Sequence, residues 1–498
     1  MFEKLKSTCK DQAFLGLLIL GLVLLCQNLW VPGFFQDGYI YAAFGKNAAE
    51  KGHWLIPHLS PYVYKEFFQH LPLPFMLEGL FFKIFPANYT TARLYGVLFP
   101  LGILVIMYHW LKGKDKNWAF ISGFLFLLIP AMLKKSRFPN TDTPMMMVFF
   151  LFALFYWQAF ERDRIKDWLL AGLFFGLAIL IKGPFGLFLP GIVFLHQIFA
   201  NRGRALLGWK AWVALLLGAG LFSLWPISLA LIGRIDAFTT WADSTFMHNM
   251  LNERQFQGTH FYDYIVFMLK QLPHLFILYL IAAFKYGKSL KTLPGFLILF
   301  FGMYIFMISL IKVKYSNYLM MSYPFIAMCA GYFVCKKYGD KLKNLIPWVK
   351  GLGIIAALVF AIFPVAKEIR RDPDVYKLLS LTRALNNPPR VWLLTEGVYP
   401  YYAMANLLAF EGDAHLYNIG RGEIPDIVNN KLLNYQNEFK DNFSFAKKSW
   451  LILLRVKTYN DLPIEIKEKT EILAHFQKYD FYAVMPKINS INRQILSF

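Results

Sequence analysis

The sequence is poor in charged residues and in cysteine. Only 17% of the 498 residues are charged, whereas 57% are hydrophobic and 50 are phenylalanines. In soluble proteins about a quarter of the residues are charged. This composition therefore excludes an ordinary soluble chain and indicates a protein embedded in lipid. The C-terminal part has no cysteine, so we predict no disulfide framework there. The four cysteines are Cys9, Cys26, Cys329 and Cys335.

Motifs of soluble enzymes are also missing. The sequence has no P-loop, no G-x-G-x-x-G after a strand and no G-x-S-x-G. The Asp-Pro-Asp segment at 372–374 is similar to a nucleotide-sugar D-x-D motif, but a turn explains it better. The net charge of +21 does not indicate nucleic acid, because the basic residues lie in short clusters between apolar runs.

Long apolar runs dominate the first three quarters of the chain and predict membrane-spanning helices. We take the first run as a retained helix rather than a signal peptide, because no small-residue cleavage site follows it. The runs lie at 13–33, 91–111, 118–133, 144–160, 167–181, 185–200, 209–232, 262–284, 293–311, 316–335 and 347–366.

Clusters of lysine and arginine occupy every second connection between these runs, as at 112–116, 162–166, 202–210, 285–291 and 336–343. The positive-inside rule makes these connections and the N-terminus cytoplasmic, and the alternate connections periplasmic. The segment 71–86 is apolar enough to be another span, but it is short, and counting it would invert every later loop. We therefore predict that 71–86 and 38–52 are helices lying along the outer membrane interface.

After residue 366 the pattern changes to short β-type runs at 391–396, 450–456 and 481–486, alternating with helical stretches at about 374–386, 424–438 and 462–477. We predict a transmembrane domain over 1–366, with an outer loop at 34–90, and a periplasmic α/β domain over 367–498. The fold class is a polytopic α-helical membrane protein with about 11 to 13 transmembrane helices.

Two acidic residues in the outer connections flank apolar helices. They are Asp37, after the first run, and Asp142, before the fourth. A carboxylate near the bilayer costs free energy unless it has a partner, so both are candidate catalytic residues. The alternative for Asp142 is structural, because Thr141 or Asp142 in the sequence NTDTP is suited to capping the next helix.

Cations also lie in outer connections, where the charge rule disfavours them. They are Arg137, Lys182, Arg254, Lys312 and Lys314, with Lys134 and Lys135 beside Arg137. A polyanionic ligand such as a phosphate would explain them. The alternative is that they extend to lipid headgroups.

Five of the ten histidines collect in the outer connections, at His53, His58, His70, His248 and His260. None of them has the tight spacing of an H-E-x-x-H zinc motif. A divalent metal, with His70 and His260 as its candidate ligands, therefore stays an open alternative.

Six segments of the chain contain short motifs of polar, aromatic, glycine and proline residues. The first is QDGYIYAAFGKNAAEKGHWLIPHL at 36–59, with its acid, its aromatic residues and its G-x-W-x-x-P ending. It is followed by QHLPLPF at 69–75, SRFPNTD at 136–142, GLAILIKGPFGLFLP at 176–190, FMHNMLNERQFQGTHFYDY at 246–264 and KVKYSNYLMMSYPFIAM at 312–328. Together these segments cover most of residues 30–330. In this order they resemble the protein-mannosyltransferase and aminoarabinose-transferase (ArnT-like) superfamily.

The resemblance implies a GT-C fold and a polyprenyl-phosphate sugar donor. It places the family's first-loop acid at Asp37 and its second acid at Asp142. The donor-phosphate contacts would fall among Arg137, Lys182, Arg254, Lys312 and Lys314. Further substrate or cavity residues would be Tyr39, Tyr41, His70, His248, His260 and Tyr318.

The sequence departs from the family at two positions. Gly38 stands where many members have a second acid after the first, so no residue at this position of the chain takes the role of that acid. The family's E-K-P-P-L appears as Gln69-His70-Leu71-Pro72-Leu73, which lacks a glutamate that can bind metal in aminoarabinose transferases. The sequence therefore leaves both a zinc site and the identity of the sugar open.

We hypothesise a membrane glycosyltransferase with Asp37 as base. We expect it to invert the anomeric centre, because a single displacement needs no protein nucleophile. Asp142 would orient the acceptor or the loop, and the acceptor would be lipid A, another glycan or a protein. The enzyme would lie in the bacterial inner membrane. Two alternatives remain open: a transporter or flippase of lipid-linked substrates, and a non-catalytic assembly protein.

Overall fold

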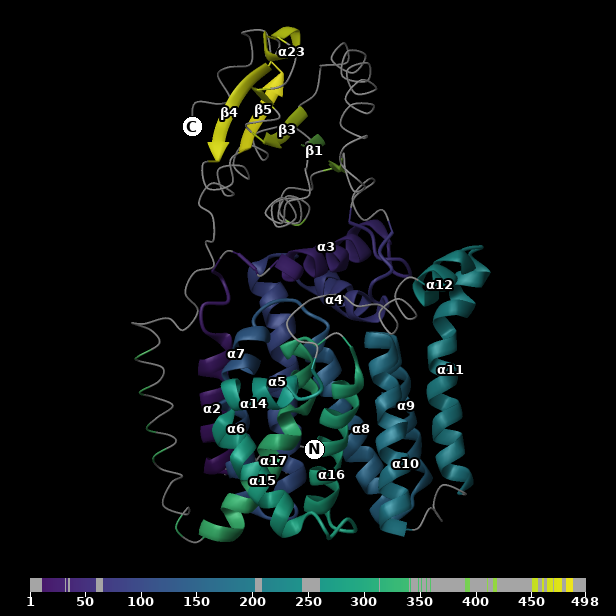
Figure 1. Cartoon of the computed structure of the whole chain (residues 1–498), viewed down its shortest axis with the longest axis vertical. Coiled ribbons are helices and arrows are strands. Elements are labelled where there is room, and N and C mark those ends of the chain that lie inside the picture. The colour runs from purple at the N-terminus through teal and green to yellow at the C-terminus, as the bar shows by residue number, and fades with distance from the viewer. Residues whose placement is uncertain are drawn as a thin grey trace. The chain divides into compact units, whose positions relative to one another are not determined.

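A computed structural model of the whole chain gives the arrangement of its helices and strands (Figure 1). It divides into a helical unit, made of 1–31, 68–77 and 89–367, and a second unit, made of 32–67, 78–88 and 368–498. The structure describes residues 11–31, 33–34, 36–59, 66–201, 208–243, 260–312, 314–339, 341, 348, 351, 355, 359, 390–394, 410, 415–418, 450–455, 459–460, 464–468, 470–476 and 481–486. Each unit is described by itself below, and the domain boundary at 366/367 stays a prediction.

The helical unit follows the apolar runs of the sequence. Its helices are α2 (Gln12–Cys26), α5 (Tyr89–Lys112), α6 (Lys116–Leu127), α7 (Pro130–Lys135), α8 (Asp142–Arg162), α9 (Ile165–Lys182), α10 (Phe188–Asn201), α11 (Trp209–Leu231), α12 (Ile235–Trp241), α14 (Asp263–Gln271), α15 (Pro273–Tyr286), α16 (Leu293–Leu310) and α17 (Tyr323–Tyr338), with the 3-10 segments η1 (Gly183–Leu187) and η4 (Ser316–Ser322).

Six helical segments of the described residues are long and apolar enough to cross a membrane, two of them joining consecutive elements. The predicted run at 262–284 is divided into α14 and α15, which are bent by 117° where Pro273 opens the second helix. The first run forms α2, which has only 15 residues. The run at 347–366 lies mostly outside the described residues. The chain is therefore a multi-pass helical membrane protein, as predicted.

Local capping explains where several helices begin. Asp115 accepts hydrogen bonds from the backbone N–H groups of Asn117 at 2.8 Å and Trp118 at 3.1 Å, which starts α6. Asp11 caps α2 in the same way through Phe14. These carboxylates occupy the helix ends at which unpaired N–H groups need acceptors.

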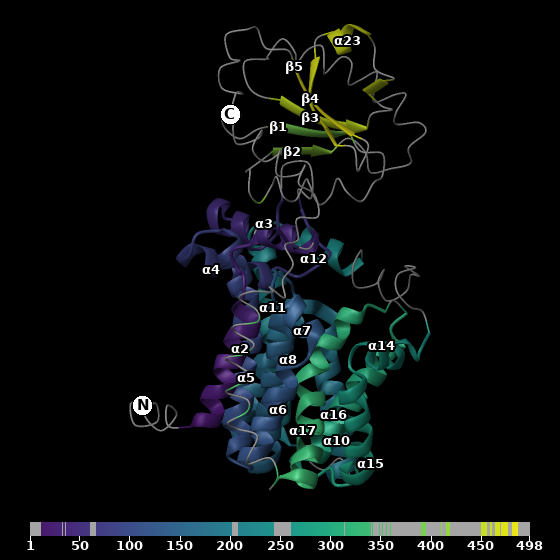
Figure 2. The ribbon, with the colours of Figure 1, turned by 90° about the vertical axis from the view of Figure 1, so that its left-hand side faces the viewer.

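Asp11 also joins α2 to α5, which lie side by side in Figure 2. Its carboxylate accepts a bond from the Tyr108 hydroxyl at 2.9 Å and lies 2.6 Å from the Lys112 ammonium. Burial would raise the pKa of Asp11, but the contacts with Lys112 and Tyr108 and the charge of Lys116 outweigh it and lower the pKa to about 2. The residue is therefore ionised at neutral pH.

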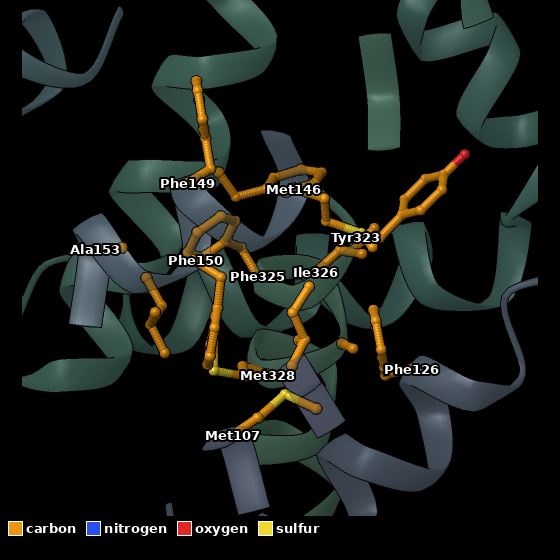
Figure 3. Close-up of a cluster of buried hydrophobic side chains, with 14 of the residues drawn as sticks. Met107, Phe126, Met146, Phe149, Phe150, Ala153, Tyr323, Phe325, Ile326 and Met328 are labelled. Carbon is orange, nitrogen blue, oxygen red and sulfur yellow. The ribbon is translucent and has the colours of Figure 1, made fainter. Parts of the chain in front are cut away.

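The core of the helical unit is a single cluster of large apolar side chains. Figure 3 shows part of it, where Phe149 and Phe150 of α8 lie among Phe325, Ile326 and Met328 of α17. A second close contact joins α9 to α11, which run beside each other in Figure 1. There, a Cβ added to Gly172 would lie 2.3 Å from the Ala214 carbonyl oxygen.

The second unit contains α3 (Gln36–Lys51), the part of α4 (Leu73–Ile84) from Glu78 onward, the short helix α23 (Ile464–Glu468) and a mixed sheet. The described strands have the order β2-β1-β3-β5-β4. The first three pair in parallel, whereas β5 is antiparallel to β3 and β4. The strands are β1 (Arg390–Leu394), β2 (His415–Asn418), β3 (Trp450–Arg455), β4 (Thr470–Phe476) and β5 (Phe481–Pro486).

The predicted helices at 38–52 and 71–86 correspond to α3 and α4, and three predicted strands correspond to β1, β3 and β5. The helix predicted at 462–477 is wrong in its second half, because Thr470–Phe476 forms β4. The physical reason is non-local: this segment pairs with β5, with an irregularity between Ile472 and Ala474. The helices predicted at 374–386 and 424–438 lie outside the described residues.

Candidate functional site

An ion pair between Asp142 and Lys182 is the centre of the candidate site in the helical unit. Asp142 is the first residue of α8 and Lys182 the last residue of α9, and the Lys182 ammonium contacts Oδ1 of Asp142. Each side chain is only 9% exposed. Sequence analysis singled out both residues, and the structure brings them together.

The alternative role of Asp142, as a helix cap, belongs to another residue. Oδ1 of Asn140 accepts hydrogen bonds from the backbone N–H groups of Asp142 at 2.9 Å and Thr143 at 2.8 Å. The Asn140 amide donates in turn to the carbonyls of Lys135 and Phe138. Because Asn140 satisfies the helix terminus, the carboxylate of Asp142 is left to face Lys182.

Aromatic rings surround the Lys182 ammonium. Its Nζ lies 5.4 Å from the ring centre of Phe185 and 5.1 Å from that of Tyr318, and the two rings are 4.5 Å apart. Tyr304 donates a hydrogen bond to the Tyr318 carbonyl at 2.6 Å, which fixes the segment that carries this ring. Ring faces attract cations, so the two aromatic rings and the Asp142 carboxylate both attract the Lys182 ammonium.

The turn after Lys182 depends on glycine. Gly183 has a φ of +54°, which L side chains rarely adopt, and a Cβ there would lie 3.1 Å from Cζ2 of Trp241. The same Cβ position is 3.7 Å from Cδ1 of Leu71. The segment at 70–71 therefore lies against the turn that follows the Lys182 side chain.

His70 belongs to the same electrostatic environment. Burial is the largest influence on its pKa, and the positive charge of Lys182 acts in the same direction, while Asp142 opposes them. The result is a pKa lowered to about 4. His70 is therefore neutral at physiological pH and offers a hydrogen-bonding ring rather than a second positive charge.

Arg137 is buried beside Arg93. It donates to the carbonyl of Gln27, and Arg93 donates to the carbonyls of Arg137 at 3.1 Å and Val31 at 3.0 Å. Burial and the neighbouring charge of Arg93 lower the pKa of Arg137 to about 10, so it stays protonated at neutral pH. Its Nη1 atom is buried with no hydrogen-bond partner among the described residues.

Lys314 and Lys312 follow α16 and differ in exposure. Lys314 is buried, and its ammonium donates to the carbonyl of Ile311 at 2.7 Å. Burial lowers the pKa of Lys314, while the charge of Asp263 opposes the shift. Lys312 is exposed.

The remaining candidates in the helical unit do not form a metal site in the described residues. His260 is exposed, and its Nδ1 lies 3.9 Å from Oδ1 of Asp263. His248 and Arg254 lie outside the described residues. In the described part of the chain, no group of three or more histidine, cysteine, aspartate or glutamate side chains is arranged to hold a metal ion.

Asp37, Tyr39 and Tyr41 belong to α3 in the second unit. Asp37 lies in the first turn of this helix and is exposed. Tyr39 is buried and packs edge-on against Phe34, with 5.3 Å between ring centres, and Tyr41 is partly buried. A negative charge at a helix N-terminus is stabilised by the helix dipole. That Asp37 meets the cations of the helical unit in one pocket stays a prediction.

Sequence reasoning missed Asn140, Arg93 and Tyr304. A signal existed for Arg93, because an arginine at the start of an apolar run is costly unless it has partners. Asn140 also had a signal, since asparagine is a preferred capping residue. Tyr304 lies within an apolar run and had none.

Comparison with known proteins agrees with the sequence motifs. Residues 69–227 match the family described as dolichyl-phosphate-mannose-protein mannosyltransferase. An uncharacterized protein of Aquifex aeolicus is 25% identical over 342 residues, which cover 67% of this chain and 66% of that protein. An undecaprenyl phosphate-alpha-4-amino-4-deoxy-L-arabinose arabinosyl transferase of Pseudomonas savastanoi is 25% identical over 182 residues, 35% of this chain and 33% of that protein.

The fold is similar to that of solved structures. ArnT from Cupriavidus metallidurans bound to undecaprenyl phosphate has a TM-score of 0.67 with this chain at 12% sequence identity, covering 94% of this chain and 96% of that one. The apo structure of the same protein gives the same TM-score at 13% identity. The predicted GT-C fold is thus confirmed: the chain has the fold of the two ArnT structures.

Proposed function

We propose that this chain is a membrane glycosyltransferase that moves a sugar from a polyprenyl-phosphate donor to a lipid A, glycan or protein acceptor. The observation that carries the proposal is that the segment matching the mannosyltransferase family, 69–227, contains both members of the buried Asp142–Lys182 pair. Relatives with 25% and 24% identity are named as transferases that use undecaprenyl phosphate-linked aminoarabinose, which supports a polyprenyl carrier.

The reaction joins an acceptor oxygen to the anomeric carbon of the sugar. The bond from that carbon to the carrier's phosphate oxygen breaks, and its electron pair stays on the phosphate. When the acceptor is a hydroxyl, its proton passes to a base, for which we propose the carboxylate of Asp37. A single displacement of this kind inverts the anomeric centre.

Lys182 is the best-supported of the proposed phosphate contacts. An ammonium group has three N–H donors, and the contact with Asp142 uses one of them. The others are able to donate to the phosphate as its negative charge increases during transfer. Arg137, Arg254, Lys312 and Lys314 remain proposed contacts, although Arg137 and Lys314 already donate to backbone carbonyls.

Asp142 has a supporting role in this proposal. Its carboxylate holds the Lys182 ammonium in place, so that the loop after α9 and the cation act together. Tyr318 contacts the same ammonium, and His70 offers a neutral ring beside it. Tyr39, Tyr41, His248 and His260 remain proposed substrate or cavity residues.

The proposal places the enzyme in the inner membrane, with the N-terminus in the cytoplasm. The acids, the phosphate contacts and residues 367–498 would lie on the periplasmic side. This arrangement follows the lysine and arginine clusters of the sequence. The partners are then the lipid-linked sugar, the bilayer and the acceptor.

The test is transfer of labelled sugar from synthetic polyprenyl-phosphate donors by the purified protein in lipid vesicles. Asp37→Asn should lower the turnover at least about a hundredfold, because a general base contributes about 10²–10⁴ and the amide cannot take the proton. Glu50→Gln is the matched control, since Glu50 is an exposed carboxylate on the same helix. It should transfer sugar at the wild-type rate.

Three results bear directly on the proposal. Normal turnover by folded Asp37→Asn would remove the assignment of the base. Movement of the labelled lipid across the vesicle membrane without any new glycoside would favour a flippase instead. A wild-type protein that transfers none of a panel of polyprenyl-phosphate sugars to total envelope acceptors would exclude the glycosyltransferase.

A further inference from the structure

Helix α3 is fixed in the second unit by a residue far away in the sequence. Lys46, in the middle of α3, is only 8% exposed, and its ammonium donates a hydrogen bond at 3.0 Å to the backbone carbonyl of Phe410. Phe410 is itself 2% exposed. A lysine whose head is buried loses its hydration, so a bond to a carbonyl oxygen is needed to compensate it.

Phe410 also contacts Phe34, which lies just before α3. Its ring centre lies 5.7 Å from that of Phe34, and Phe34 packs in turn against Tyr39 in the first turns of the helix. Phe34 precedes Asp37 by three residues and Lys46 follows it by nine. Phe410 therefore contacts the chain on both sides of the proposed base.

The residues next to Lys46 in α3 contact the segment that follows the helix. The ring of Phe44 lies 4.6 Å from that of Phe67, and the amide of Asn47 donates to the carbonyls of His58 at 2.7 Å and Leu59 at 2.9 Å. These contacts restrain α3 within its own segment of the chain. Lys46 adds a restraint from the C-terminal part of the sequence.

Glycine allows α4 to approach α3 closely. A Cβ at Gly45 would lie 2.8 Å from Cγ of Glu78, so α4 approaches the backbone of α3 at this residue. The Glu78 side chain is buried, its Oε1 has no hydrogen-bond partner among the described residues, and burial raises its pKa well above the usual value. The two helices are therefore closely packed at this position, where burial disfavours the charged form of Glu78.

We propose that Lys46 and Phe410 position the base: the C-terminal domain sets the orientation of α3 through them and thereby places the Asp37 carboxylate for proton transfer. The inference rests on the proposed function. Lys46 is a positioning residue in this proposal, because it acts through the helix and not on the substrate.

The distance along the helix explains why this restraint matters. Nine residues of α-helix span about 14 Å at 1.5 Å per residue, so a rotation of about 5° at Lys46 displaces Asp37 by about 1 Å. A misplacement of about 1 Å is enough to reduce a rate by about a hundredfold. Substrate binding depends less steeply on the position of a base, so the turnover number should fall more than the affinity.

The test compares Lys46→Met, Lys46→Arg and Lys51→Met in the transfer assay with the full-length protein. Lys46→Met should lower kcat by at least about tenfold and change KM for donor and acceptor by less than about twofold, because the placement of the base changes while the binding residues stay. Lys46→Arg should recover most of kcat, since arginine still donates to a carbonyl. Lys51, exposed at the end of α3, is the matched control and should have no effect.

Folding is checked by thermal unfolding in detergent. If Lys46→Met does not fold, Phe410→Leu is measured in its place. This variant removes the ring contact with Phe34 and keeps the backbone carbonyl, and it should show the same fall in kcat. Wild-type kcat in the folded variant, or a higher KM for the acceptor with kcat unchanged, would overturn the inference. These results differ from failure of the proposed function, in which the wild type shows no transfer or Asp37→Asn keeps it.

Discussion

At the scale of single residues, the buried Asp142–Lys182 pair raises the question of whether it serves stability or catalysis. Two charges removed from water are costly, and their mutual attraction roughly repays that cost when the geometry is good. Removing one partner is different, because the other charge is left buried and uncompensated. Replacing both partners removes the charge problem and is often neutral for stability.

Lys182→Met should therefore lower the free energy of unfolding by about 3–5 kcal/mol, because the Asp142 carboxylate loses its counter-ion. The double variant Asp142→Asn, Lys182→Met should recover much of that stability but not the transfer of sugar. Thermal unfolding and the transfer assay, carried out on the same preparations, measure the two effects separately.

An exposed ion pair provides the control for this prediction. Lys210 lies 2.6 Å from Asp163, whose side chain is 73% exposed. Lys210→Met should change stability by less than about 1 kcal/mol, because water screens such pairs. A double variant at 142 and 182 that is less stable than Lys182→Met alone would contradict the energetic account of the buried pair.

At the scale of the elements, glycine determines how closely α9 and α11 approach. Cβ atoms placed at Gly172 and Gly176 of α9 would lie 2.3 Å from the Ala214 carbonyl oxygen and 2.8 Å from that of Gly218. Small residues spaced by four allow helix backbones to come together in lipid, where packing rather than the hydrophobic effect drives association. The sequence contained this spacing, but only the structure identifies the partner helix.

Gly172→Val should consequently separate α9 from α11 and lower the thermal midpoint, because the side chain would overlap the Ala214 backbone. Gly220→Val is a matched control on α11, since a Cβ at Gly220 has no neighbour within 4 Å among the described residues. Unfolding of both variants in detergent tests the prediction. Equal effects of the two substitutions would show that helix propensity, and not the contact, is responsible.

Prediction of the elements succeeded where a signal was local. Apolar runs located most of the described helices of the membrane part within a few residues, because lipid requires long apolar helices. The prediction of a helix was wrong at Thr470–Phe476, because this segment pairs with β5 and forms a strand. The break before Pro273 had a local signal, the proline itself, but the angle of 117° depends on the packing around it.

At the scale of the whole molecule, the orientation in the membrane is the prediction that most needs a measurement. The clusters at Lys114 and Lys288 should face the cytoplasm, whereas the connection after α11, which contains Thr239, should face the periplasm. In a chain with its four cysteines replaced by serine, Thr239→Cys should react with a membrane-impermeant maleimide in intact spheroplasts. Lys114→Cys and Lys288→Cys should react only after permeabilisation, and the opposite pattern would reject the orientation.

The sequence alone determined that this is a polytopic membrane protein and singled out Asp37, Asp142 and Lys182 as candidate site residues, because hydropathy, charge and short motifs are properties of neighbouring residues. The tertiary structure decided which of these side chains meet. Asp142 pairs with Lys182 across two helices, and Lys46 bonds to Phe410, 364 residues away. Such contacts depend on how the helices pack, and no local pattern along the chain records that packing.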